Sequence, residues 1–151
     1  MFMARGQMYT LEALIASLVI FGVVIFAINH SPKFGTETKE FTTLQLKKYA
    51  DDILEILDLE NESHGSLLSE WIEYGTNKND WSMFDTNFSQ INKILKQHLV
   101  IMLHVEVLKP DGSLVHEWGP QPPEGAVSSF RVVPVSSPPY AYEVRLYLWY
   151  V

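Results

Sequence analysis

Residues 99–118 have the sequence LVIMLHVEVLKPDGSLVHEW and carry the clearest structural pattern in the chain. Apolar and polar side chains alternate along residues 99–108, which is typical of a β-strand with one buried face. The tetrapeptide KPDG at 109–112 then predicts a turn, because proline restricts φ and glycine accepts a positive φ. Residues 114–118 return as a second strand, so the stretch predicts an antiparallel hairpin.

Two further strands are expected downstream, over residues 126–135 and 140–151. A proline-rich loop, GPQPPEG, precedes the first of them, and Pro134 places the end of that strand at a sheet edge or a bulge. The last strand alternates two sets of side chains. Tyr147 and Trp149 share one of its faces, which either is exposed as an aromatic patch or belongs to the core.

Helical periodicity dominates the residues before the hairpin. Apolar positions spaced three and four apart predict helices over residues 38–59, 66–74 and 81–98, and Ser66 is a suitable N-cap for the second helix. Helices followed by a run of strands indicate an α+β fold. The expected domain therefore has two to three helices and then a C-terminal four-stranded antiparallel sheet.

Residues 8–28, MYTLEALIASLVIFGVVIFAI, form an apolar run whose one charged residue is Glu12. As a helix this run would be about 30 Å long, which matches the hydrocarbon core of a bilayer. It is longer than the apolar core of a cleaved secretory signal. The run therefore predicts a long N-terminal hydrophobic helix, serving as a transmembrane segment or as a filament core.

The residues around the start of this run are distinctive. Arg5, Gly6 and Gln7 stand immediately before it, and Glu12 lies in its first turns. This arrangement resembles the class III signal peptide of archaeal type IV pilins and pilin-like proteins. The resemblance implies a leader of residues 1–6, cut by the membrane-embedded prepilin peptidase between Gly6 and Gln7. Glu12 is then the sixth residue after the cut instead of the familiar fifth, and a cut after Gln7 would restore the spacing.

Glu12 has two interpretations. It is either an interfacial carboxylate near a helix N-terminus, where the helix dipole favours negative charge, or a functional group. The resemblance implies the second: Glu12 would pair with the N-terminal amine that cleavage exposes, in its own or a neighbouring subunit, and so set the register of assembly. Four small residues offer a helix-packing face or reflect ordinary membrane-helix composition. They are Ala13, Ala16, Ser17 and Gly22.

The expected organisation is a leader at 1–6, a transmembrane or assembly helix at 7–31 and an extracytoplasmic α+β domain at 32–151. We expect a cytoplasmic N-terminus on the basis of the pilin-like motif, although the positive-inside count, with lysines after the apolar run, gives an ambiguous or reversed orientation. Asn61 and Asn87 begin Asn-x-Ser triplets and are candidate glycosylation sites if the domain is outside the cell.

Composition excludes several kinds of protein. The chain has 18 acidic and 11 basic residues and a net charge of −7. This negative charge disfavours binding to the phosphate backbone of nucleic acids. It has no cysteine, so disulfides, thiol nucleophiles and cysteine-based zinc sites are excluded. Phosphate-binding loops and hydrolase nucleophile motifs are also missing from the sequence.

The predicted hairpin brings one group of metal-binding residue types together. Its turn would place Glu106 near His116, with His104 and Glu117 close by. Such groups can hold a metal ion, but the solvated polar face of a half-exposed sheet is the favoured explanation. We therefore expect no metal, no cofactor and no catalytic residues.

These observations predict a structural subunit, minor or accessory in view of the Glu12 spacing, of an archaeal type IV pilus-like surface filament. Its partners would be the membrane, the prepilin peptidase and other pilin-like subunits. The alternative is a single-span, membrane-anchored extracytoplasmic binding domain that does not polymerise. A third hypothesis is a membrane-anchored metalloenzyme that uses His104 and His116.

Overall fold

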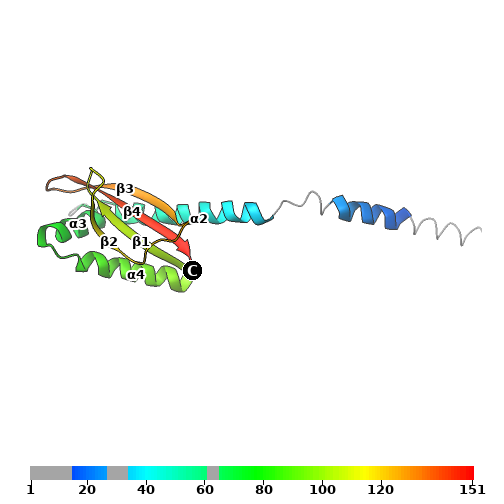
Figure 1. Cartoon of the computed structure of the whole chain (residues 1–151), viewed down its shortest axis with the longest axis horizontal. Helices are drawn as coiled ribbons and strands as arrows, with labels where there is room; N and C mark the ends of the chain where they lie inside the picture. The colour runs from blue at the N-terminus through cyan, green and yellow to red at the C-terminus, as the bar shows by residue number, and fades with distance from the viewer. Residues whose placement is uncertain (1–14, 27–33, 61–64) are drawn as a thin grey trace, which may run out of the picture. The chain divides into compact units, whose positions relative to one another are not determined.

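The computed structural model describes residues 15–26, 34–60 and 65–151 (Figure 1). It divides into two compact units, Met1–Glu40 and Phe41–Val151. In the first unit, residues 15–26 are helical. The second unit contains the sheet and the helices that pack on it.

The predicted long hydrophobic helix is wrong. The helix of residues 15–26 has 12 residues and is therefore only about 18 Å long. In the described part of the chain, no helix combines the length and the apolar character needed to cross a membrane. Hydropathy measures the length of an apolar sequence, whereas the described helix covers residues 15–26. Residues 8–14 and 27–28, which the prediction also counted, lie outside the described residues.

Three more helices follow: α2 (Phe34–Leu57), α3 (Leu67–Lys78) and α4 (Ser82–Leu99). Ser66 caps α3 as expected, because its hydroxyl accepts a hydrogen bond from the Ser69 amide at 3.1 Å. Asn79 ends α3 in the left-handed conformation, which asparagine tolerates well. The Asp80 carboxylate then accepts a hydrogen bond from the Ser82 amide and marks the start of α4.

The four strands are β1 (Ile101–Leu108), β2 (Leu114–Trp118), β3 (Val127–Pro134) and β4 (Ala141–Tyr150). They form one antiparallel sheet in the order β2-β1-β4-β3, so the C-terminal strand lies in the interior of the sheet. The four-stranded antiparallel sheet expected from the sequence is present, although β1 begins two residues later than predicted. The delay arises because Val100 ends α4 with a positive φ of 57°.

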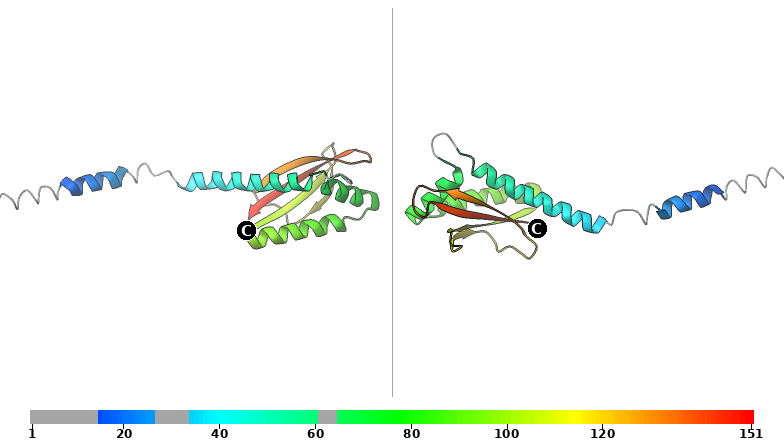
Figure 2. Two further views of the ribbon diagram at one scale, coloured as in Figure 1. Left: turned by 180° about the vertical axis from the view of Figure 1, so that it is seen from behind. Right: turned by 90° about the horizontal axis from the view of Figure 1, so that it is seen from above.

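The helices α2, α3 and α4 lie on one side of the sheet (Figure 2). Alternate residues of the two central strands point into that layer and are fully buried, including Leu103, Val105 and Leu146. Phe84 and Phe88 of α4 meet them, with ring centroids 4.6 Å apart. Together these side chains make one hydrophobic core between the sheet and the helices.

Polar contacts hold α2 and α3 against β3 at the edge of the sheet. Asp51 of α2 accepts a hydrogen bond from the Ser129 hydroxyl, and Asp58, just past the end of α2, pairs with the Arg131 guanidinium at 2.6 Å. The Ser69 hydroxyl of α3 donates to the Pro134 carbonyl at 2.9 Å. These bonds fix the helices against a strand that has a neighbour on only one side.

Replacing Phe84 by alanine tests the core. We expect Phe84→Ala to lower the free energy of unfolding by about 3–5 kcal/mol, because it removes a fully buried ring and leaves a cavity. Phe41→Ala is the matched control, since Phe41 is 68% exposed, and it should cost about 0.5 kcal/mol or less. Urea unfolding of the full chain in mild detergent measures both. All four tryptophans lie in the second unit, so their fluorescence reports on it. Equal costs for the two variants would contradict this core.

Candidate functional site

The helix of residues 15–26 presents an unusual surface. Its sequence is IASLVIFGVVIF, in which Ser17 is the one polar residue, and every residue of it is exposed. Its large apolar side chains are 43% to 64% exposed. Continuous apolar surface of this kind is typical of a segment that contacts lipid or another protein.

The small residues predicted to allow helix packing are partly described. Ala16, Ser17 and Gly22 lie on this exposed helix, and a Cβ atom added at Gly22 would meet no described atom within 4 Å. Ala13 and the proposed processing and pairing residues lie outside the described residues, as does the first glycosylation candidate. Those residues are Gly6, Gln7, Glu12 and Asn61.

Asn87, the second glycosylation candidate, lies on α4. Its side-chain amide donates a hydrogen bond to the Met83 carbonyl at 2.7 Å and is half-buried. Attachment of a glycan would need this side chain to leave its present contact.

Glu106 and His116 of the hairpin lie on opposite faces of the sheet. Glu106 stands directly opposite Glu117, whereas His116 stands opposite Val107. Residues paired across a sheet share a face, so the expected contact between Glu106 and His116 is wrong. The expected neighbourhood of His104, Glu106 and Glu117 is present, on the face away from the helices.

His116 belongs to the helix-covered side. Its ring stacks on Trp81 with a centroid distance of 4.4 Å and an interplanar angle of 9°. Its Nε2 lies 2.6 Å from a carboxylate oxygen of Asp85, and its ring meets the edge of Phe84. His116 therefore joins β2 to the first turn of α4, which is a structural role.

The opposite side of the sheet carries no helix of the described chain, and we call it the open face. The loop between β2 and β3 covers part of it, where Gly119 packs against β1. A Cβ atom at Gly119 would lie only 2.7 Å from the Leu103 carbonyl oxygen, so the approach requires glycine. The open face is formed by alternate residues of the four strands, including Met102, His104, Glu106, Glu117, Phe130, Arg145, Tyr147 and Trp149.

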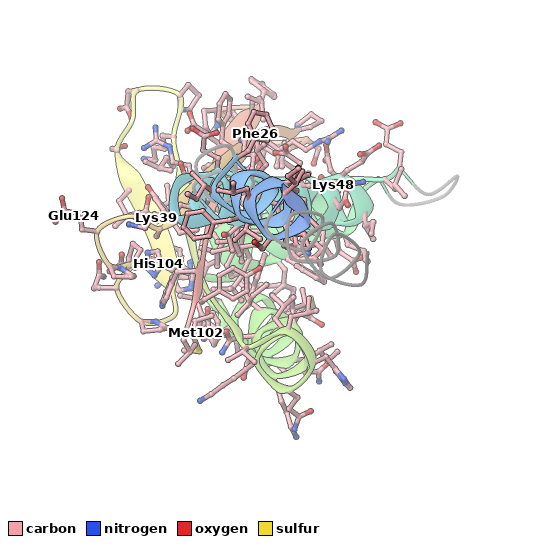
Figure 3. The ribbon with its side chains drawn as sticks, turned by 90° about the vertical axis from the view of Figure 1, so that its right-hand side faces the viewer. Phe26, Lys39, Lys48, Met102, His104 and Glu124 are labelled. Atoms are coloured by element: carbon pink, nitrogen blue, oxygen red, sulfur yellow. The ribbon has the colours of Figure 1, made fainter. Side chains whose placement is uncertain are left out.

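His104 is fully buried beneath this loop. In Figure 3 it lies within the fold, whereas Glu124 projects outward from the β2–β3 loop. The His104 Nδ1 atom lies 3.2 Å from the Gly119 carbonyl oxygen. Its Nε2 atom is also buried but has no hydrogen-bond partner within the described chain. A buried polar atom without a partner is rare and calls for an explanation.

The carboxylates of Glu106 and Glu117 lie near the Nε2 atom of His104. An oxygen of Glu106 lies 3.5 Å from Nε2 and one of Glu117 lies 3.7 Å away. Their side chains are 20% and 43% exposed, so the group opens toward solvent. The Tyr147 hydroxyl donates to the second oxygen of Glu106 at 3.3 Å. One nitrogen and two oxygens that can bind a cation are thus brought within 4.8 Å of one another.

The positively charged side chain that is paired with this group in the sheet bonds to a different carboxylate. Arg145 of β4 stands opposite Glu106, but its Nε donates to Glu143 on its own strand. That hydrogen bond to Glu143 raises the pKa of Arg145 above its usual value. The carboxylates beside His104 have no ion-pair partner other than that histidine among the contacts of the described residues.

The sequence identified the residue types of this group. It did not predict that His104 is buried or that its Nε2 atom has no hydrogen-bond partner in the described chain. Alternation alone places His104 and Glu106 together on one face of β1. The burial of His104 depends on the Gly119 loop, which passes over β1 from the end of the next strand. The only sign of this loop contact in the sequence is a glycine directly after a strand, and such a glycine is weak evidence.

Residues 5–137 match a family described as "Family of unknown function (DUF7288)". Because the match covers most of the chain, this protein belongs to that family. No curated protein and no solved structure matches the chain.

Gly119→Ala tests the close approach of the loop. Gly112 and Gly119 both have a positive φ, at 86° and 102°, but a Cβ atom at Gly112 would meet nothing within 4 Å. Gly112→Ala should therefore cost about 1 kcal/mol of stability from backbone strain alone. Gly119→Ala should cost about 1–3 kcal/mol more, because it also forces the loop off β1. Urea unfolding of the two variants measures the difference, and equal costs would show that the loop does not contact β1 closely.

Proposed function

We propose that this protein is a pilin-like structural subunit of an archaeal surface filament, assembled through its N-terminal apolar segment. The observation that carries the proposal is the exposed apolar helix of residues 15–26. The processing motif at Arg5, Gly6 and Gln7 supports it from the sequence. Membership of a family of unknown function neither adds to the proposal nor opposes it.

The energetic argument starts from the apolar side chains of that helix. Fully covering one valine, leucine, isoleucine or phenylalanine contributes about 1.5–3 kcal/mol. Nine such side chains of the helix are exposed, so covering it contributes on the order of 10 kcal/mol. Lipid would cover them in the precursor, and the same segment of neighbouring subunits would cover them after assembly.

Charge would then set the register of the assembly. In the proposed filament, Glu12 pairs with the amine that cleavage before Gln7 exposes. Pairing makes burial of both charges tolerable among apolar segments. The α+β domain stays outside the apolar core and supplies contacts at the filament surface, so the proposed role is structural and not catalytic.

A charged substitution in the apolar helix tests this function. Ile20 is 64% exposed, so Ile20→Glu should leave the α+β domain folded. It should abolish filaments on cells that produce the full chain, because a carboxylate cannot be covered by apolar neighbours without a large cost. Ile20→Leu is the matched control and should assemble normally. Electron microscopy and sedimentation of sheared cell-surface material measure assembly.

Two results would contradict the proposal. Filaments containing the Ile20→Glu variant at the normal level would show that the apolar helix is not the assembly surface. A wild-type protein that stays monomeric in the membrane fraction would favour the anchored, non-polymerising domain instead.

A further inference from the structure

We propose that His104, Glu106 and Glu117 form a binding site for a divalent transition-metal cation of the Zn²⁺ type. The site lies on the open face of the sheet and joins β1, β2 and the loop after β2. It uses none of the residues to which we assign assembly, so it stands or falls separately from the proposed function.

The hydrogen bond of His104 sets the tautomer. The Gly119 carbonyl oxygen can only accept, so Nδ1 must carry the proton that bonds to it. In a neutral imidazole, Nε2 is then left with a lone pair. This is the usual arrangement of a metal-binding histidine, whose other ring nitrogen donates to a backbone carbonyl or a carboxylate.

That lone pair faces two acceptors and no donor in the described structure. Carboxylate oxygens accept hydrogen bonds and cannot satisfy an unprotonated Nε2. Glu106 and Glu117 also stand directly opposite each other, where like charges are unfavourable. A cation between the three groups removes both problems at once, since it binds the nitrogen and neutralises the carboxylates.

The spacing suits a metal better than a hydrogen bond. The Nε2–oxygen distances of 3.5 and 3.7 Å exceed the usual length of a charge-assisted hydrogen bond, about 2.7–2.9 Å. Atoms bound tetrahedrally to zinc at about 2.1 Å lie about 3.4 Å from one another. Each carboxylate is therefore close to the separation from Nε2 that a shared cation needs.

The kind of donor narrows the choice of cation. An imidazole nitrogen with two carboxylates suits zinc and similar transition metals, whereas calcium and magnesium prefer oxygen alone. Three protein ligands leave one tetrahedral position for water, and the 43% exposure of Glu117 gives solvent access to it. The ligands come from β1 and β2, and His104 also hydrogen-bonds to Gly119 in the loop after β2. The bound cation would therefore stabilise the pairing of β1 with β2 and the position of this loop.

Zinc binding to the full chain in detergent, stripped with a chelator and dialysed, tests the site. We expect calorimetry to show a single zinc ion per chain and the melting temperature to rise with zinc concentration. Glu106→Gln and Glu117→Gln should each weaken binding about tenfold or more. Glu55→Gln, on the exposed side of α2, is the matched control and should bind as the wild type does.

Nitrogen NMR of the imidazole rings gives a second measurement that needs no substitution of the buried histidine. We expect zinc to shift the Nε2 signal of His104 while Nδ1 keeps its proton. Two results would overturn the proposal. One is zinc binding that Glu106→Gln and Glu117→Gln leave unchanged. The other is a His104 ring that carries both protons and does not respond to zinc, which would make the cluster an ion pair.

Discussion

The antiparallel pairing of β1 with β4 is the constraint on which the rest of the domain depends. The two strands pair without interruption from Ile101 opposite Tyr150 to Leu108 opposite Glu143. Because side chains alternate across a strand, this register sends one set into the helical layer and the other to the open face. A shift of one residue would bury Glu106 and Arg145 in the core and expose Leu103 and Leu146.

The same register explains why two histidines of one hairpin have different environments. His116 turns to the helices and contacts Trp81, Phe84 and Asp85. His104 turns to the open face, where the Gly119 loop buries it and satisfies one of its nitrogens. The other nitrogen is directed at two carboxylates. The open face thus combines burial with unsatisfied polar chemistry, which a purely structural surface would avoid.

Local signals in the sequence were sufficient for much of the domain. Period-two alternation, the turn at residues 109–112 and the Ser66 cap each act over a few residues, and each predicted the observed element. Features that depend on distant segments were predicted less well. The start of β1 was missed because Val100 adopts an unfavourable left-handed conformation. The neighbours of Glu106 were misplaced because the bulge next to Leu108 alters the pairing with β2.

The N-terminal unit raises a different physical question, since the predicted apolar run is longer than the described helix. The described helix of residues 15–26 has large apolar side chains that are 43% to 64% exposed. In the proposed function, processing at Gly6–Gln7 would convert a membrane-held precursor into an assembling subunit. The most direct measurement is therefore the intact mass of the protein from its native cells, beside a Gly6→Val variant. The account predicts a mature chain that begins at Gln7 and is lost in the variant. A chain that retains Met1 in both would contradict it.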